Sequence, residues 1–237
     1  MLEDRGLATT MIGLIRPHME RSQNPRGLFV PFPLGRPLGR PGDAAFQRRV
    51  LMAALRLLER RDGPVILEDF PDDAPGQAGV PGWAPPFALP VPATPGTPQA
   101  WAAALAAELA QVLPWWERAR DRFGRTTVGV SFQPPQAWPA YAAAFLAGGL
   151  PDAPAPMPSP AVGLRFLADD LKALYTEAVQ AVGDAPAPDQ VSAWLYRDTL
   201  AGRFLLALRT AALASDDPGF KTAGGRFLVP IPWLPPA

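Results

Sequence analysis

The 237 residues contain no cysteine and a single histidine, His18. Without cysteine, this chain forms no disulfide, no cysteine-ligated zinc or iron–sulfur centre and no thiol nucleophile of its own. One histidine cannot build a histidine-rich metal site, so we expect no bound metal. The formal net charge of zero argues against general nucleic-acid binding.

Long apolar runs are also lacking. The longest candidate, residues 101–116, is interrupted by a glutamate, a glutamine and a proline, whereas a membrane-spanning helix needs about 18 apolar residues in a row. The acidic start of the chain, Met1–Arg5, is unlike a secretory signal peptide. The sequence therefore predicts a cytoplasmic protein without a membrane segment. Lysine is scarce as well, and together with abundant alanine and proline this is typical of GC-rich bacterial genomes.

Short strand-like segments occupy the first seventy residues. Strands are expected at Leu7–Leu14, Gly27–Phe32 and Val65–Leu67, where apolar and β-branched residues stand between turn residues. After Asp43, a typical N-cap residue, apolar residues recur every three or four positions and predict an amphipathic helix. These positions are Phe46, Val50, Ala53, Ala54, Leu57 and Leu58. The order of elements predicts a small parallel βαβ unit, a Rossmann- or flavodoxin-like half, over residues 1–70.

The rest of the chain divides into a linker and a helical part. Residues 71–98 contain nine prolines, and we expect this linker to lie against the surface through its scattered aromatic residues. Residues 99–237 are expected to be mainly helical, because apolar residues recur there at three- and four-residue spacing. Helices are predicted to begin at Thr97, Pro135, Ser159 and Asp189, a strand over Thr126–Phe132 and an extended apolar arm over Arg226–Leu234.

Three short strands form a thin sheet with unpaired edges, which are a liability in a monomer. Either later segments or another chain would pair with them. The seven tryptophans and the apolar arm favour contacts with another subunit. The sequence therefore predicts an oligomer.

The loop between the second strand and the following helix, Phe32–Asp43, is the first candidate site. Ligands of open parallel sheets bind at the carboxyl ends of strands, and helix N-termini favour anions. Gly35, Arg36, Gly39 and Arg40 are therefore candidates for binding a small anionic substrate; the alternative is a plain turn with solvated arginines. The loop lacks the glycines and lysine of a dinucleotide fingerprint or a P-loop, so no cofactor is expected.

Polar residues also follow the first and third strands. A histidine and a carboxylate with suitable pKa values can transfer protons, which makes His18, Glu20 and Glu68 candidate catalytic residues. Asp69 is a candidate substrate-binding residue, because a carboxylate at this edge can hold a substrate ammonium. The alternatives are a surface turn for His18 and Glu20, and capping of the next turn for Glu68 and Asp69.

The last predicted helix contains polar residues and a glycine among apolar neighbours. Gly202 costs about 1 kcal/mol relative to alanine in a helix, so we expect another segment to pack closely on it. Arg197, Thr199 and Arg203 mark this helix as a further candidate site. An ion pair between Asp198 and an arginine is the simpler interpretation.

Residues 6–58 resemble a known family. The stretches "RGLATTMIGL" and "PRGLFVPFPLGRPLGRPGDAAFQRRVLMAALRLL" are similar to the C-terminal half of the selenoprotein B subunit of glycine, sarcosine, betaine and D-proline reductases. In that family a strand ending in P-x-P-L-G-x-P precedes a helix rich in arginine and alanine. Residues 31–37 are the most specific match, and the resemblance covers roughly a quarter of the chain.

The family reduces its substrates through a selenocysteine or cysteine on the portion that precedes this stretch. Since the chain has no cysteine, the resemblance implies a partner chain with the redox nucleophile, or a lost activity. The leading hypothesis is a subunit of a heteromeric reductase-like enzyme that cleaves a C–N or C–S bond of a small anionic substrate. The alternatives are a non-catalytic binding or assembly protein, and a cofactor-independent, desulfhydrase-like lyase or hydrolase that uses His18 and Glu68.

Overall fold

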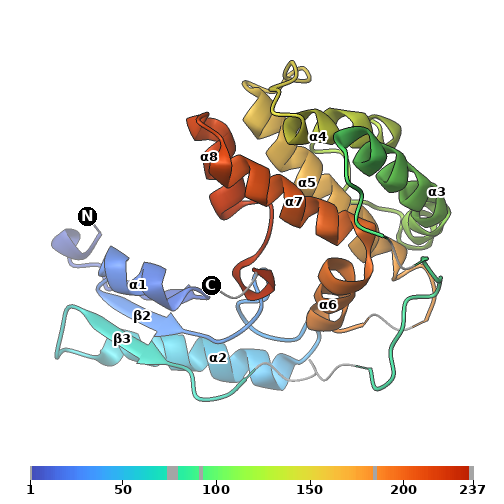
Figure 1. Ribbon diagram of the computed structural model, residues 1–237. Coiled ribbons are helices and arrows are strands. Elements are labelled where there is room, and N and C mark those ends of the chain that lie inside the picture. The colour runs from blue at the N-terminus through green and yellow to red at the C-terminus, as the bar shows by residue number, and fades with distance from the viewer. Residues whose placement is uncertain (1, 74–79, 91–92, 184–185, 235–237) are drawn as a thin grey trace. The chain divides into compact units, whose positions relative to one another are not determined.

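The computed structural model describes residues 2–73, 80–90, 93–183 and 186–234 (Figure 1). The chain divides into two compact units, Met1–Ala78 and Gly79–Ala237. The first holds a small three-stranded parallel sheet, and the second is mainly helical. This confirms the predicted α/β class with a mostly helical remainder. None of the described helices is both long and apolar enough to cross a membrane.

The sheet of the first unit has the strand order β1-β2-β3, with all strands parallel. β1 spans Met11–Gly13, β2 spans Arg26–Phe29 and β3 spans Ile66–Asp69. Each strand overlaps the segment predicted for it, although β1 occupies only three residues of Leu7–Leu14. In the described part of the chain, β1 and β3 pair with β2 alone, so both are edge strands.

Two helices cover this sheet, α1 over Arg16–Ser22 and α2 over Ala44–Arg56. A Cβ on Gly27 would lie 2.8 Å from Met19 of α1, whereas the next residue, Leu28, packs in a cluster with Val50 of α2. Adjacent strand residues face opposite sides of a sheet, so the helices lie on opposite faces (Figure 1). Right-handed crossovers in this strand order would place both on one face. The Rossmann- or flavodoxin-like prediction is therefore not confirmed.

Three phenylalanines join the loop after β2, helix α2 and the end of β3. The ring centroids of Phe32, Phe46 and Phe70 lie 5.6, 5.9 and 5.8 Å apart in the three pairs. Asp43 Oδ1 accepts a hydrogen bond of 3.0 Å from the Phe46 N–H, so the predicted N-cap is confirmed. The loop between β2 and α2 is thus attached to the core at both ends.

The second unit is a bundle around α5, whose residues Leu164, Leu167, Leu171 and Leu174 are fully buried. Its described α-helices are α3, Pro98–Phe123; α4, Trp138–Leu146; α5, Pro160–Ala178; α6, Pro188–Asp198; α7, Leu200–Ala214; and α8, Pro218–Arg226. Short 3-10 turns span Glu3–Arg5, Leu57–Glu59, Pro135–Ala137 and Ile231–Trp233.

Part of the proline-rich segment lies against this bundle, as expected for the linker. Phe87 stacks on Trp115 with ring centroids 5.4 Å apart. The Gln190 side chain of α6 accepts from the Val80 N–H at 2.9 Å and donates to the Val80 carbonyl oxygen at 2.8 Å. Residues 74–79 and 91–92 of the predicted linker lie outside the described residues.

The strand predicted over Thr126–Phe132 is wrong, because this segment is a loop without strand pairing. The Asp170 carboxylate of α5 accepts hydrogen bonds from the backbone N–H groups of residues 129–131. Glu177, also on α5, accepts hydrogen bonds from the side chain and backbone of Thr127. Two carboxylates of α5 therefore accept hydrogen bonds from the backbone N–H groups of this segment. In a sheet, these groups would donate to a neighbouring strand.

The single helix predicted from Asp189 is two helices that meet at Thr199. The Thr199 hydroxyl accepts from the Gly202 N–H at 3.1 Å and so caps α7. The buried Glu108 carboxylate of α3 accepts from the first N–H groups of α7, at Leu200 and Ala201. It also accepts from the Tyr175 hydroxyl at 2.7 Å, and burial together with this carboxylate raises the pKa of Tyr175.

The apolar arm predicted to reach another subunit packs on its own unit instead. Leu228 and Val229 are buried in the bundle. The Trp233 ring stacks on Tyr196 of α6, with centroids 5.8 Å apart. The arm therefore gives no support for an oligomer.

Gly202→Ala is expected to destabilise the second unit, although alanine normally stabilises a helix by about 1 kcal/mol relative to glycine. A Cβ on Gly202 would lie 2.1 Å from the Leu195 carbonyl oxygen of α6, so we expect a loss of about 1–3 kcal/mol. Gly225→Ala in α8 is the matched control, because its nearest contact lies at 3.9 Å. Denaturant unfolding should show a loss of stability for the first variant only; equal losses would contradict the close packing.

Candidate functional site

The loop after β2, residues 33–42, is built from successive turns closed by backbone hydrogen bonds. Gly35, Gly39 and Gly42 have backbone φ angles of +86°, +85° and +82°, which residues with a Cβ rarely adopt. A Cβ on Gly39 would also lie 2.7 Å from the Phe46 ring. The predicted site residues Gly35 and Gly39 therefore allow the turns of the loop that carries Arg36 and Arg40.

Arg36 and Arg40 are exposed side chains of this loop. Among the described residues neither guanidinium has an ion-pair or hydrogen-bond partner, unlike several other arginines of the unit. The Arg40 carbonyl oxygen accepts from Gln47 Nε2 at 2.8 Å, so its backbone is held against α2. Asp43 already occupies one N–H group at the start of α2. The two arginines, more than the helix N-terminus, are therefore available to an anion.

Arg16 joins the carboxyl ends of β1 and β3. Its Nε donates to Asp69 Oδ1 at 3.1 Å, and its Nη1 pairs with Glu20 one turn along α1. The structure thus places the predicted residues Glu20 and Asp69 at the same end of the sheet, where parallel strands should bring them. Both carboxylates pair with the same guanidinium, and exposed pairs of this kind contribute roughly 0–1 kcal/mol.

Glu68 lies on the opposite face from Asp69, because adjacent strand residues alternate. Its carboxylate pairs with Arg60, which also pairs with Asp62. The hydrogen bond from Arg60 lowers the pKa of Asp62 to about 2, and these carboxylates raise the pKa of Arg60 above its ordinary value. Glu68 is therefore the partner of an arginine and not a free base.

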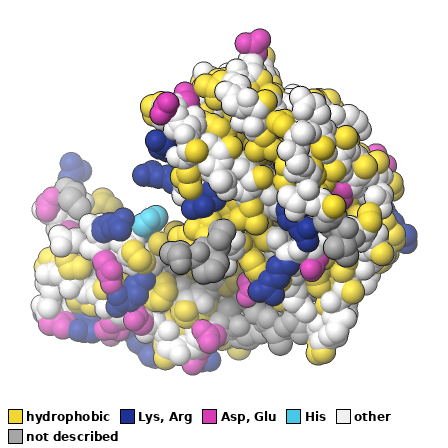
Figure 2. Space-filling view, viewed as in Figure 1, with side chains coloured by type: hydrophobic (Ala, Val, Ile, Leu, Met, Phe, Trp, Pro, Cys, Tyr) yellow, Lys and Arg dark blue, Asp and Glu magenta, His cyan; other side chains and the backbone are white. Residues whose placement is uncertain are grey.

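His18, the cyan side chain in Figure 2, is exposed on α1. It borders a depression of about 420 Å³ together with Met11 and Leu34. Glu68 lines a different depression, between α2 and β3. The structure does not bring His18 and Glu68 together, so the acid–base pair of the lyase alternative is not assembled. Within the described residues, no group of three or more His, Asp or Glu side chains could hold a metal ion.

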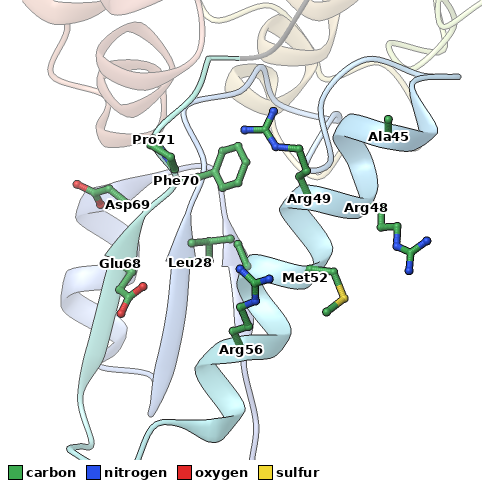
Figure 3. A pocket seen from close by; sticks show the side chains of 11 residues that line it. Leu28, Ala45, Arg48, Arg49, Met52, Arg56, Glu68, Asp69, Phe70 and Pro71 are labelled. Atoms are coloured by element: carbon green, nitrogen blue, oxygen red, sulfur yellow. The ribbon is translucent and has the colours of Figure 1, made fainter.

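The groove between α2 and β3 has a volume of about 490 Å³ (Figure 3). Arg49 and Arg56 stand on its α2 wall, and the Arg49 guanidinium lies 5.6 Å from the centroid of the Phe46 ring. This groove was not expected from the sequence, because the apolar spacing of the helix marks only the side that packs on the sheet. The relevant pattern was the seven-residue spacing of Arg49 and Arg56, which places both on one side of the helix.

The comparisons with known proteins identified no relative of this chain. Neither the scan against family models nor the searches of curated proteins and of solved structures returned a match for this chain. Its function is therefore inferred from the loop at residues 33–42, the edges of the sheet and the sequence pattern of residues 6–58.

Proposed function

We propose that this chain is the substrate-binding subunit of a heteromeric, reductase-like enzyme that cleaves a C–N or C–S bond of a small anionic substrate. A partner chain supplies the cysteine or selenocysteine nucleophile, since these 237 residues contain no cysteine. The observation that carries the proposal is the pair of exposed arginines, Arg36 and Arg40, on a loop fixed by turns and left-handed glycines. The resemblance of residues 6–58 to the selenoprotein B reductases supplies the reaction class.

Two guanidinium groups suit the capture of a carboxylate. Each presents a planar fork of N–H donors that binds two oxygens at once. Arg36 and Arg40 follow the carboxyl end of β2, the edge at which open parallel sheets bind ligands. A substrate held through its carboxylate keeps its C–N or C–S bond free for attack by the partner's thiolate or selenolate.

The sheet and its acidic residues favour a partner over independent catalysis. β1 and β3 have one strand neighbour each within the described residues, and such edges favour the addition of a strand from another chain. Glu20, Glu68 and Asp69 are each paired with an arginine. The same pairing makes a non-catalytic binding or assembly protein the second candidate.

Isolation of the chain from its native host, followed by mass spectrometry and thiol alkylation, tests the proposal. We expect a stoichiometric partner with a reactive cysteine or selenocysteine. Alkylation should abolish turnover by modifying the partner's nucleophile, since this chain contains no cysteine that could react. Turnover that survives alkylation would contradict the proposal. A chain that binds anions, has no such partner and shows no turnover would support the second candidate.

A further inference from the structure

The side of α2 that faces away from the sheet is apolar as well as basic. Leu51, Met52 and Leu55 are 45%, 40% and 40% exposed, and their spacing places them side by side on the helix. Phe46 and Val50 of the same helix are buried against the sheet. A surface helix normally has a single apolar stripe, so the second apolar side of α2 is available for packing against another segment.

The groove beside this apolar side is open at β3. Leu28 and Phe70 line it from the sheet, and Met52 and Arg56 line it from α2 (Figure 3). β3 is an edge strand among the described residues. Helices that pack side by side lie about 8–10 Å apart. A helix laid along α2 would therefore contact Met52, which belongs both to the apolar side and to the groove.

Among the described residues, the charged side chains of this groove that have no ion-pair partner are arginines. The carboxylates on the β3 wall are paired with arginines outside the groove, and Arg49 is paired with Asp72. Arg48 and Arg56 also line the groove, and in the described part of the chain neither has an ion-pair partner. They lie about two turns apart along the helix, on the order of 12 Å.

We propose that this groove, together with Leu51, Met52 and Leu55, is the docking site for an amphipathic helix of a partner protein. The apolar residues of the partner's helix would cover the exposed side of α2, and acidic residues beside them would pair with Arg48 and Arg56. A second copy of this chain is a poor occupant, because it would bring the same arginines face to face. The inference rests on this face of the unit and not on the anion site at residues 33–42.

The test uses the full chain and two designed helical peptides of about 20 residues. Both carry a leucine seam, flanked by glutamate in one and by lysine in the other, and binding is followed by fluorescence anisotropy. We expect the glutamate peptide to bind about tenfold or more tightly than the lysine peptide. Arg48→Glu/Arg56→Glu should reverse this preference. The matched control Arg21→Glu/Arg61→Glu replaces two exposed arginines outside the groove and should preserve it.

A second variant tests the apolar contact. Leu55→Asn is on an exposed position, so the protein should stay folded while the glutamate peptide binds more weakly. The proposal is overturned if the two peptides bind with equal affinity or if neither binds. It is also overturned if Arg48→Glu/Arg56→Glu leaves the preference for the glutamate peptide unchanged. Dimerisation that Leu55→Asn abolishes would assign the groove to a second copy and would also overturn it. Loss of anion binding at residues 33–42 changes none of these readouts, so the two proposals fail separately.

Discussion

Asp170→Ala is expected to lower the free energy of unfolding of the second unit by about 3 kcal/mol. The fully buried carboxylate accepts three backbone hydrogen bonds from residues 129–131, at 2.7, 3.0 and 2.8 Å. Each bond to a charged group contributes roughly 1.5–3 kcal/mol, and the loop recovers part of this loss when it opens to water. Denaturant unfolding followed by tryptophan fluorescence measures the effect, because all seven tryptophans lie in residues 79–237.

Asp169 is the matched control on the same helix. It pairs with Lys172 at 2.8 Å, and its side chain is 39% exposed. Asp169→Ala should therefore cost less than about 1 kcal/mol. Equal losses in the two variants would mean that Asp170 does not anchor the loop.

Arg36→Ala/Arg40→Ala is expected to weaken the binding of a small carboxylate or of inorganic phosphate by about ten- to a hundredfold. Loss of even one charge-assisted pair has this effect, since such a pair contributes roughly 1.5–3 kcal/mol. Arg36→Lys should already weaken binding, because lysine lacks the planar fork of donors. NMR titration of the full chain with acetate and with inorganic phosphate measures the dissociation constants.

Arg21→Ala/Arg61→Ala removes the same charge from exposed positions elsewhere in the first unit. This variant should bind both anions as the unchanged protein does. If the two double variants lose affinity equally, the effect is general electrostatics. If the loop variant loses none, residues 33–42 are only a turn and the site lies elsewhere.

Local sequence patterns were sufficient to predict three of the helix starts. Asp43 was expected to cap a helix, and helices were expected to begin at Thr97 and Ser159. Each of these side chains accepts a hydrogen bond from the N–H group three residues later. Capping and apolar spacing depend on residues within one or two turns of each other. They can therefore be recognised without knowledge of the tertiary fold.

The errors in the predicted fold arise at contacts between residues that are distant in sequence. Thr126–Phe132 has the β-branched composition of a strand, but Asp170 on another helix binds its backbone. The helix predicted from Asp189 ends at Asp198, where Glu108 and Thr199 cap a new helix. A buried carboxylate that satisfies backbone groups has no local sequence pattern.

The place of the candidate loop in the fold was predictable from the sequence, but the ion pairs of the other candidate residues were not. The strand-to-helix loop and its two arginines were found from turn residues and element order. That Glu20, Glu68 and Asp69 pair with arginines could not be predicted, because it depends on strand register and on which face each residue occupies. The separation of His18 from Glu68 has the same origin.

The most direct test of the central claim is turnover of a small anionic substrate with a C–N or C–S bond, measured under reducing conditions. The rate is compared for this chain alone, for its cysteine- or selenocysteine-containing partner alone, and for the two together. We expect turnover only by the two together, with kcat/KM lowered by about ten- to a hundredfold in Arg36→Ala/Arg40→Ala. Turnover by this chain alone, or an unchanged kcat/KM in the double variant, would contradict the account.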